Sequence, residues 1–214
     1  MRYDTIFFDF DGTLNESGPG IFAATRAMMR ELDIPDIPDS EMRKLVGPPL
    51  RVGFSTILGI DGELLDEAVS IYRLKAKTCG IDKMKAYDGI LDLLGDLRTA
   101  GSTVGIVTAK VHSTALEHIE LFGFAPYIDY IRGARSDGSG DKSELLRIAC
   151  DELGVDKRRT AMVGDRYYDL CAANESGVDG IGVLYGYGSA AELAECDPAY
   201  IAATVADLRN ILFS

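Results

Sequence analysis

The sequence has little of what several classes of protein require. No apolar run is long enough to cross a bilayer, so an integral membrane protein is not expected. The first residues mix acidic and apolar side chains without a small-residue cleavage site, which is not typical of a signal peptide. Acidic residues outnumber basic ones by 34 to 22, and the resulting net charge of −12 argues against nucleic acid as a partner.

Histidine is scarce as well. His112 and His118 are the only two histidines, and they lie six positions apart in a predicted helix. A zinc pair on one helix needs the i, i+4 spacing, so a zinc site is not expected. We predict that both are surface or hydrogen-bonded histidines.

The cysteines show neither a CxxC pair nor a metal-type spacing. They stand at Cys79, Cys150, Cys171 and Cys196. We interpret them as buried or free thiols of a reducing compartment, which predicts a cytoplasmic protein.

What is present is the composition of an ordinary globular protein. The 214 residues are 47% hydrophobic and 26% charged, which supplies enough apolar side chains for a core. This length fits one large domain, or one domain that carries a smaller insert. An acidic chain can still bind a small phosphorylated metabolite, because a cation and a few basic residues can reverse the potential inside one cleft.

Hydrophobic spacing divides the chain into two parts. After a first apolar strand, it predicts helices over 17–32, 41–46, 51–58 and 64–75. From Tyr87 onward amphipathic helices alternate with short apolar strands, which are predicted at 103–108, 128–131, 160–165 and 180–184. Repeated strand–helix units predict an α/β fold, a doubly wound parallel sheet with helices on both faces. We predict a core of residues 1–14 and 88–214 with an inserted α-helical cap of residues 15–87.

Two carboxylates end the first strand. Residues two apart on a strand point to the same side, so Asp9 and Asp11 are expected to share one small space. At an effective dielectric constant of ~20 and a separation of ~4 Å, their repulsion is roughly 4 kcal/mol. An Asp-Gly hairpin turn is the structural alternative, but a helix rather than a partner strand follows. The pair therefore indicates a functional site in which a proton or a cation separates the charges.

Further polar residues follow the other predicted strands. They are Thr108 and Asp165 at strand ends, Asp169 one helical turn later, and Lys142 at the start of a helix. Thr108 or Asp165 could cap a helix, and Asp169 could be an acid favoured by the helix dipole. A lysine at a helix N-terminus opposes the dipole, so Lys142 is harder to explain structurally. Because ligands bind outside the carboxyl ends of parallel strands, we expect all four to converge with the two carboxylates of the first strand.

These groups suit phosphoryl transfer. One carboxylate can attack phosphorus to form an aspartyl-phosphate, and a second carboxyl can protonate the leaving oxygen and then activate water. Mg²⁺ prefers oxygen ligands, shares them with a substrate phosphate and would relieve the repulsion among the acids. A hydroxyl and an ammonium suit the remaining phosphoryl oxygens.

Four segments, in this order, resemble the motifs of the haloacid dehalogenase superfamily. They are Asp9-Phe10-Asp11-Gly12-Thr13-Leu14, Thr108 after an apolar strand, Lys142, and Gly164-Asp165-Arg166-Tyr167-Tyr168-Asp169. The helical insert resembles the C1-type cap of the phosphoglycolate-phosphatase-like branch of that superfamily. Two further segments are similar to that branch, Gly47-Pro48-Pro49-Leu50 and Val183-Leu184-Tyr185-Gly186-Tyr187-Gly188. The similarity extends over nearly the whole chain and implies a Rossmann-like core.

The resemblance implies roles in the chemistry. It implies that Asp9 is the nucleophile and that Asp11 is the general acid and base. It also implies that Thr108 and Lys142 bind the phosphoryl group. Lys110 is a rival for Lys142, although the spacing before the fourth motif favours Lys142. An acid at position 11 argues against dehalogenation, because the dehalogenases of the superfamily lack one there.

The resemblance also implies a metal site. Mg²⁺ would be held by the Asp9 carboxylate, the main-chain carbonyl of Asp11 and the Asp165 carboxylate. Asp169 would be either a further ligand or an acid that supports the ligands.

A cap between two hinges suits a lid that excludes water from the substrate. Arg51, close behind the Gly-Pro-Pro-Leu loop, is the first candidate for a cap residue that binds a second anionic group of the substrate. Its structural alternative is a solvated helix arginine. Arg43, Lys44 and Phe54 are weaker candidates.

We therefore expect a Mg²⁺-dependent phosphatase that hydrolyses a small phosphomonoester through an aspartyl-phosphate, with phosphoglycolate as the first candidate. A 5'-nucleotidase or pyrophosphatase of the same family is an alternative, and so is a phosphosugar mutase similar to β-phosphoglucomutase. A receiver-like signalling domain uses similar groups but is much shorter and has no cap. We expect no membrane partner, and a monomer or a weak homodimer.

Overall fold

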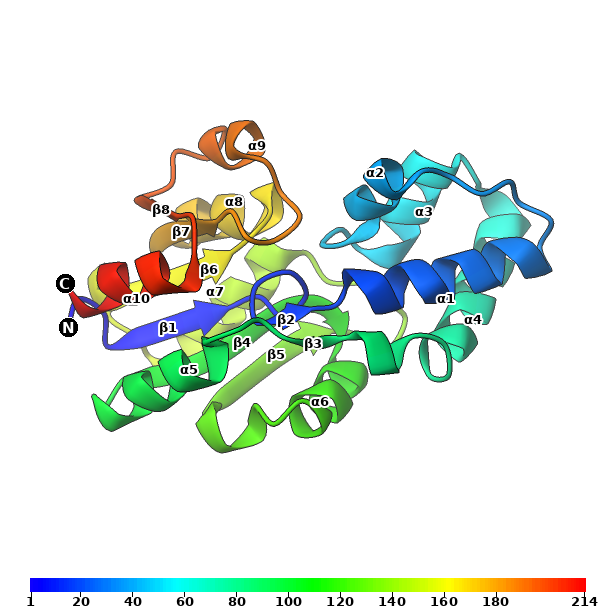
Figure 1. Cartoon of the computed structure of the whole chain (residues 1–214). Coiled ribbons are helices and arrows are strands. Elements are labelled where there is room, and N and C mark those ends of the chain that lie inside the picture. Colours follow the sequence, from blue (N-terminus) through cyan, green and yellow to red (C-terminus); the bar gives the residue numbers. More distant parts are fainter.

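Strands and helices alternate through the larger part of the chain, which is the core (Figure 1). A computed structural model describes residues 1–214. The core strands are β1 (Thr5–Phe8), β4 (Thr103–Val111), β5 (Tyr130–Ala134), β6 (Thr160–Gly164), β7 (Asp179–Val183) and β8 (Tyr200–Ala202). Its helices are α5 (Ile90–Thr99), α6 (His112–Leu121), α7 (Lys142–Leu153), α8 (Tyr167–Ser176), α9 (Ala190–Ala194) and α10 (Val205–Phe213). Two short 3₁₀ turns, η3 (Ala125–Tyr127) and η4 (Lys157–Arg159), precede β5 and β6.

The six strands form one sheet in the order β5-β4-β1-β6-β7-β8, and every pair is parallel. Parallel neighbours need a crossover between them, and the helices supply these crossovers on both faces of the sheet. The predicted fold class, a doubly wound parallel α/β sheet, is confirmed. Strand β8 adds an edge beyond the last predicted strand.

Alternation of side chains along β1 builds the two faces of the core. Ile6 and Phe8 point to one side, where they pack in a cluster with apolar residues of α5, α6 and α10. Phe7 points to the other side and packs with Leu146 of α7 and Ala172 of α8. All three β1 side chains are fully buried. The central strand is therefore fixed from both faces, which also fixes the residues that follow it.

The segment between β1 and α5 forms the helical cap, on the right in Figure 1. It contains α1 (Gly18–Glu31), α2 (Asp39–Met42), η1 (Arg43–Leu45), α3 (Leu50–Leu58), α4 (Gly62–Ala76) and η2 (Ile81–Lys83). Its helices share an apolar cluster of their own, which includes Met28, Met42, Phe54 and Leu65. The cap thus has a separate small core.

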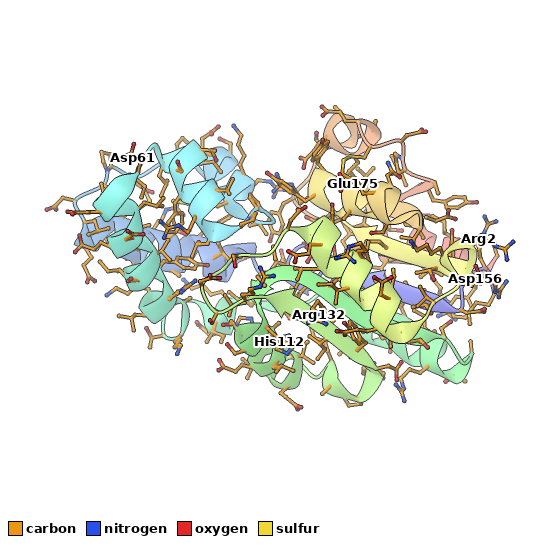
Figure 2. All side chains as sticks on the ribbon, turned by 180° about the vertical axis from the view of Figure 1, so that it is seen from behind. Arg2, Asp61, His112, Arg132, Asp156 and Glu175 are labelled. Atoms are coloured by element: carbon orange, nitrogen blue, oxygen red, sulfur yellow. A yellow bond between two sulfur atoms is a disulfide. The ribbon has the colours of Figure 1, made fainter.

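Two short strands connect the cap to the core. β2 (Asn15–Glu16) pairs in antiparallel fashion with β3 (Lys85–Ala86), so the chain enters and leaves the cap side by side. Both chain termini lie at the far end of the core, where Arg2 N–H donates to the carbonyl of Leu212. Figure 2 shows the same division from behind, with Asp61 on the cap and Arg2 and Asp156 at the opposite end of the core.

None of the helices combines the length and the apolar character that a bilayer crossing requires.

The four cysteines are not all thiols, and this corrects the interpretation made from the sequence. Cys171 on α8 and Cys196 after α9 form a disulfide with their Cα atoms 5.5 Å apart, whereas Cys79 and Cys150 are free. The packing of α8 against the α9 region brings together two cysteines that are 25 positions apart. Sequence spacing gives no sign of such a tertiary contact. The cysteines therefore no longer support a reducing compartment as a set.

The disulfide can be tested by counting thiols. Unreduced protein in denaturant should have two thiols that react with Ellman's reagent, and the reduced protein should have four. A disulfide that closes a loop of this length stabilises a fold by about 3 kcal/mol, so a Cys171→Ser, Cys196→Ser double variant should melt at a lower temperature. Four reactive thiols before reduction would show that the pair is not bonded.

Candidate active site

Three adjacent strands carry the polar residues that were predicted to converge. β4 and β6 flank β1 and run parallel to it, so the three strands end side by side. Asp9 follows β1, Asp165 follows β6, and Thr108 lies near the end of β4. The carboxyl edge of the sheet therefore brings together residues from distant parts of the chain.

A cluster of three buried carboxylates lies at the centre of this edge. Asp9, Asp165 and Asp169 are at most 2% exposed, and each offers one carboxylate oxygen within 4.8 Å of the others. Lys142, the first residue of α7, is 5% exposed. Its Nζ lies 2.9 Å from Asp9 Oδ1 and 2.6 Å from Asp169 Oδ1. One buried ammonium thus pairs with two of the three acids.

Burial and mutual repulsion perturb the protonation of these groups. Burial raises the pKa of Asp9 to about 6, even though the Lys142 ammonium opposes the shift. Burial, and then the charges of Asp169 and Asp9, raise the pKa of Asp165 well above its ordinary value. Burial alone would lower the pKa of Lys142, but the carboxylates of Asp169 and Asp9 raise it, so Lys142 stays charged. The cluster therefore holds more negative charge than its lysine can balance.

Backbone and side-chain donors hold Asp165 in place. The Thr13 hydroxyl donates to Asp165 Oδ1 at 3.2 Å, and the Tyr187 N–H donates to Oδ2 at 2.8 Å. Gly12 has φ +91°, and a Cβ there would lie 2.3 Å from Asp165 Oδ2. Only glycine permits both this left-handed backbone and this close approach. The Asp-Gly pair is thus part of the site rather than a hairpin turn.

The structure tests the capping alternatives for Thr108, Asp165 and Asp169. The residue before α6 is Val111 and the residue before α8 is Arg166, so neither Thr108 nor Asp165 is a helix N-cap. Asp169 does have the capping role, because its Oδ2 accepts a hydrogen bond from the Arg166 N–H at 3.0 Å. Its other oxygen is the one that Lys142 binds.

Asp11 lies beside the cluster and pairs with the rival lysine. Lys110 Nζ is 2.9 Å from Asp11 Oδ2, and both side chains are about one-eighth exposed, at 12% and 13%. Burial acts to raise the pKa of Asp11, but the Lys110 charge and hydrogen bonds from Ser17 and Lys110 bring it below the ordinary value. Thr108, 1% exposed, accepts a hydrogen bond from the Lys110 N–H at 3.3 Å. The two lysines thus form ion pairs with different acids: Lys142 pairs with Asp9, and Lys110 pairs with Asp11.

The donor set fits a hard divalent cation. Asp9, Asp165 and Asp169 offer only carboxylate oxygens, which Mg²⁺ prefers. Asp11 Oδ1 is buried without a hydrogen-bond partner, whereas Asp9 Oδ1 faces the Lys142 ammonium at 2.9 Å. A cation among these oxygens would offset the negative charge that Lys142 leaves unbalanced.

One cavity joins this edge to the cap. It has a volume of about 510 Å³, within the range of small-molecule sites. Its core side includes Asp9, Asp11 and Thr108, so the reactive groups open into it. Apolar residues form much of its cap side: Ile21, Leu45, Leu50, Phe54, Tyr72, Ile81 and Met84.

Arg51 is not part of this cavity, and the expectation for it is corrected. Its guanidinium pairs with Asp66 of α4 at 2.6 Å, and its side chain is 48% exposed. The pairing satisfies Arg51 within the cap, which agrees with its structural alternative. Of the weaker candidates, Phe54 does line the cavity, whereas Arg43 donates to the carbonyl of Gly186 at 3.0 Å.

The two histidines have different environments. His112 is exposed, and its Nδ1 accepts a hydrogen bond from the Gly133 N–H at 3.3 Å, as predicted (Figure 2). His118 is 7% exposed, lines the cavity and has no hydrogen-bond partner at Nδ1, which corrects the prediction for it. Burial and the Lys110 charge lower the pKa of His118 to about 4, so its ring is neutral near pH 7.

Two further cations on the cavity wall were missed. Arg73, in the last turn of α4, and Lys77, directly after that helix, lie four positions apart and both line the cavity. The i, i+4 spacing was visible in the sequence, but such a pair is equally typical of a solvated helix face. Only the folded cap shows which face of α4 turns to the core.

Comparison with known proteins identifies the family and the relatives of this chain. The model of the family described as haloacid dehalogenase-like hydrolase matches residues 6–183. A 5'-nucleotidase of Pseudomonas aeruginosa is 36% identical over 100% of this chain and 97% of its own length. The tyrosine-protein kinase PtkA of Mycobacterium tuberculosis is 35% identical over 97% of this chain and 72% of its own. Among solved structures, a predicted phosphatase from Clostridium acetobutylicum is 33% identical, covers 100% of this chain and 99% of its own, and has a TM-score of 0.93.

Fold and relatives together define an α/β hydrolytic enzyme, and the expected class, a phosphatase, is confirmed by these similarities. The chain belongs to the haloacid dehalogenase-like hydrolase family.

The acid cluster predicts a pH-dependent response to Mg²⁺. The raised pKa of Asp9 means that the folded, cation-free protein keeps a proton that the unfolded chain loses, so its stability falls as the pH rises from about 4 to about 6. A cation offsets this loss where the acids are ionised. The rise in melting temperature with Mg²⁺ should therefore be larger near pH 8 than near pH 5.

Differential scanning fluorimetry with and without Mg²⁺ measures this effect. Asp165→Asn should reduce the Mg²⁺ response, and Asp151→Asn, which removes an exposed acid of α7, should leave it unchanged. An equal response at both pH values would count against a cation among the buried acids.

Proposed function

We propose that this protein is a Mg²⁺-dependent phosphatase that hydrolyses a small phosphomonoester through a phosphorylated Asp9. The observation that supports this most is the juxtaposition of Asp9, which lines the cavity between core and cap, with the buried Lys142, Asp165 and Asp169. Asp11, which also follows the first strand, lines the same cavity. It is the second carboxyl that would protonate the leaving group.

In the first step, an oxygen of the Asp9 carboxylate attacks phosphorus and the bond from phosphorus to the leaving oxygen breaks. Asp11 gives its proton to that oxygen, so the product alcohol leaves neutral. Thr108 and Lys142 bind the phosphoryl oxygens and orient the group for in-line attack. In the second step, Asp11 takes a proton from water, the water oxygen bonds to phosphorus, and the bond to Asp9 breaks. Phosphate leaves and both carboxyl groups return to their starting state.

Asp11 needs a proton for the first step, although Lys110 lowers its pKa in the ligand-free protein. A phosphoryl group bound beside it adds negative charge and competes for Lys110, and both effects raise the pKa of Asp11. The Lys110 pair thus keeps Asp11 ionised until a substrate arrives. The proton then enters together with the substrate.

The metal part of the proposal uses the groups described above. The Asp9 carboxylate, the main-chain carbonyl of Asp11 and the Asp165 carboxylate would hold Mg²⁺, with Asp169 as a further ligand or as a support for the others. Mg²⁺ supplies positive charge that stabilises the phosphoryl group as negative charge develops on it.

The cap limits the choice of substrate. Its helices line one side of the cavity, which favours a small phosphorylated metabolite over a macromolecule. Phosphoglycolate, with two carbon atoms, would fill little of a 510 Å³ cavity. A larger phosphomonoester, a nucleotide among them, uses the apolar cap wall better, and pyrophosphate is a further candidate.

Two other activities deserve a direct comparison. A phosphosugar mutase would return the phosphoryl group to a sugar, so free phosphate would not form from a hexose phosphate. The 35% identity to PtkA favours a test of phosphoryl transfer from ATP to tyrosine, because that relative is described as a tyrosine-protein kinase. A receiver-like domain is disfavoured by the cap, and it would retain its phosphoryl group rather than turn over.

The proposal also includes a cytoplasmic location and a monomer or weak homodimer without nucleic acid or membrane partners. The acidic surface supports the absence of nucleic acid. The Cys171–Cys196 disulfide counts against a strictly reducing compartment.

Removal of the nucleophile tests the central assignment. Asp9→Asn should lower kcat for p-nitrophenyl phosphate with Mg²⁺ by about a thousandfold or more, because an amide cannot attack phosphorus. Arg147→Met, which changes an exposed residue of α7, is the control and should leave kcat unchanged. Full activity of Asp9→Asn would refute the aspartyl-phosphate route.

Removal of the acid should depend on the leaving group. Asp11→Asn should lower kcat/KM far more for an alkyl phosphate than for p-nitrophenyl phosphate, since nitrophenolate leaves without a proton. A Brønsted plot over a series of aryl phosphates measures this dependence. An equal loss with all leaving groups would mean that Asp11 does not protonate the leaving oxygen.

A further inference from the structure

Two cations of the cap face the cavity without an acidic partner. Arg73 lies in the last turn of α4, Lys77 is the residue that follows this helix, and both line the cavity. Neither side chain makes an ion pair or a hydrogen bond with the protein. Lys75, between them in sequence, pairs with Glu31 at 2.6 Å, and Arg51 pairs with Asp66 at the same distance.

Acidic residues are plentiful in this chain, and neither of these two cations pairs with one. The chain has 34 acidic residues and a net charge of −12, so partners for surface cations are plentiful. Glu117 of α6 even lines the same cavity, yet it pairs with neither Arg73 nor Lys77. Both cations are therefore available for a bound molecule.

Arg73 lies where the cap meets the core. A Cβ on Gly138 would come within 3.2 Å of Arg73 Nη2, so the guanidinium lies against the loop between β5 and α7. Gly138 has φ +84° and no Cβ, so no side chain occupies the space next to the Arg73 guanidinium. Ser136 of the same loop also lines the cavity.

The other walls of the cavity differ from one another in chemical character. Asp9, Asp11 and Thr108 form the reactive end. Apolar side chains of the cap form another part of the wall, including the edge-to-face pair of Phe54 and Tyr72, whose ring centroids are 5.4 Å apart. A ligand that fills the cavity meets reactive groups, an apolar wall and two free cations.

We propose that Arg73 and Lys77 form a subsite for a second anionic group, a carboxylate or a phosphate, on the leaving group of the substrate. The inference rests on the proposed phosphatase function and specifies its substrate class. A guanidinium binds either anion through two parallel hydrogen bonds, and the neighbouring ammonium adds charge. A neutral leaving group, such as a nucleoside or a simple alcohol, leaves both cations without a partner. The subsite therefore favours phosphomonoesters with an anionic leaving group.

Matched aryl phosphates test this directly. Phenyl phosphate and 4-carboxyphenyl phosphate share the ring and the scissile bond but differ in one remote carboxylate, and hydroquinone bisphosphate carries a remote phosphate instead. We expect kcat/KM to be about tenfold higher for the better of the two anionic compounds than for phenyl phosphate, a difference of about 1.4 kcal/mol. The comparison of the two shows which anion the subsite prefers. The preference should shrink as salt rises, because exposed charges are screened.

Arg73→Met should lower this tenfold preference to about threefold, and the Arg73→Met, Lys77→Met double variant should abolish it. The loss should fall on KM, because the contact is made in both the bound and the transition state. Arg51→Met is the matched control, since it removes a cap arginine that lies outside the cavity, and it should keep the wild-type ratio. Arg73→Gln, with circular dichroism of each variant, separates a lost contact from a misfolded cap.

The outcomes separate the two levels of the proposal. No Mg²⁺-dependent hydrolysis of any of the three esters would overturn the phosphatase function itself. Hydrolysis of all three with equal kcat/KM, or an Arg73→Met ratio equal to that of Arg51→Met, would leave that function standing and overturn the subsite.

Discussion

The site depends on the burial of three carboxylates beside one ammonium. At a separation of 4.8 Å, two of these charges repel by about 3 kcal/mol even at an effective dielectric constant of ~20. Lys142 offsets part of the repulsion among Asp9, Asp165 and Asp169. The Tyr187 N–H donates a hydrogen bond to Asp165 and fixes its position. A fold keeps such a cluster only if its surroundings hold it rigidly, and the central strands of the sheet do so from both faces. The excess negative charge is also what makes the cluster suitable for a cation and a phosphoryl group.

Cap and core meet through the segment that holds Asp165. The Tyr187 N–H donates to Asp165, while the Tyr187 hydroxyl accepts from the Gly18 N–H at the start of the cap, at 2.7 Å. Arg166, next to Asp165, donates to the carbonyl of Val46 in the cap and to Glu192 of α9. The residues that support the acid cluster are thus the same ones that fix the position of the cap. Only Tyr187 and Arg166 lie between the cap and Asp165 along these contacts, so a movement of the cap would displace groups next to Asp165.

The sequence predicted what depends on local pattern. Apolar runs located the strands, and the polar residues after them, Asp9, Thr108 and Asp165, identified the edge at which they converge, because parallel strands share one carboxyl edge. It failed where tertiary packing decides. Arg51 follows a conspicuous loop, but only the packed cap shows that Asp66 satisfies it. Contacts between distant segments also determine three features that no spacing in the chain indicates. They are the cavity cations Arg73 and Lys77, the buried ring of His118 and the Cys171–Cys196 bond.

The most direct test of the account is to find the phosphoryl group on the protein. A ³²P-labelled substrate is mixed with an excess of enzyme and Mg²⁺, quenched in acid within milliseconds, and the chain is digested and sequenced by mass spectrometry. The account predicts a label that hydroxylamine removes, as an acyl phosphate requires, on the peptide that contains Asp9. Turnover without a covalent label, or a label on any other residue, would contradict it.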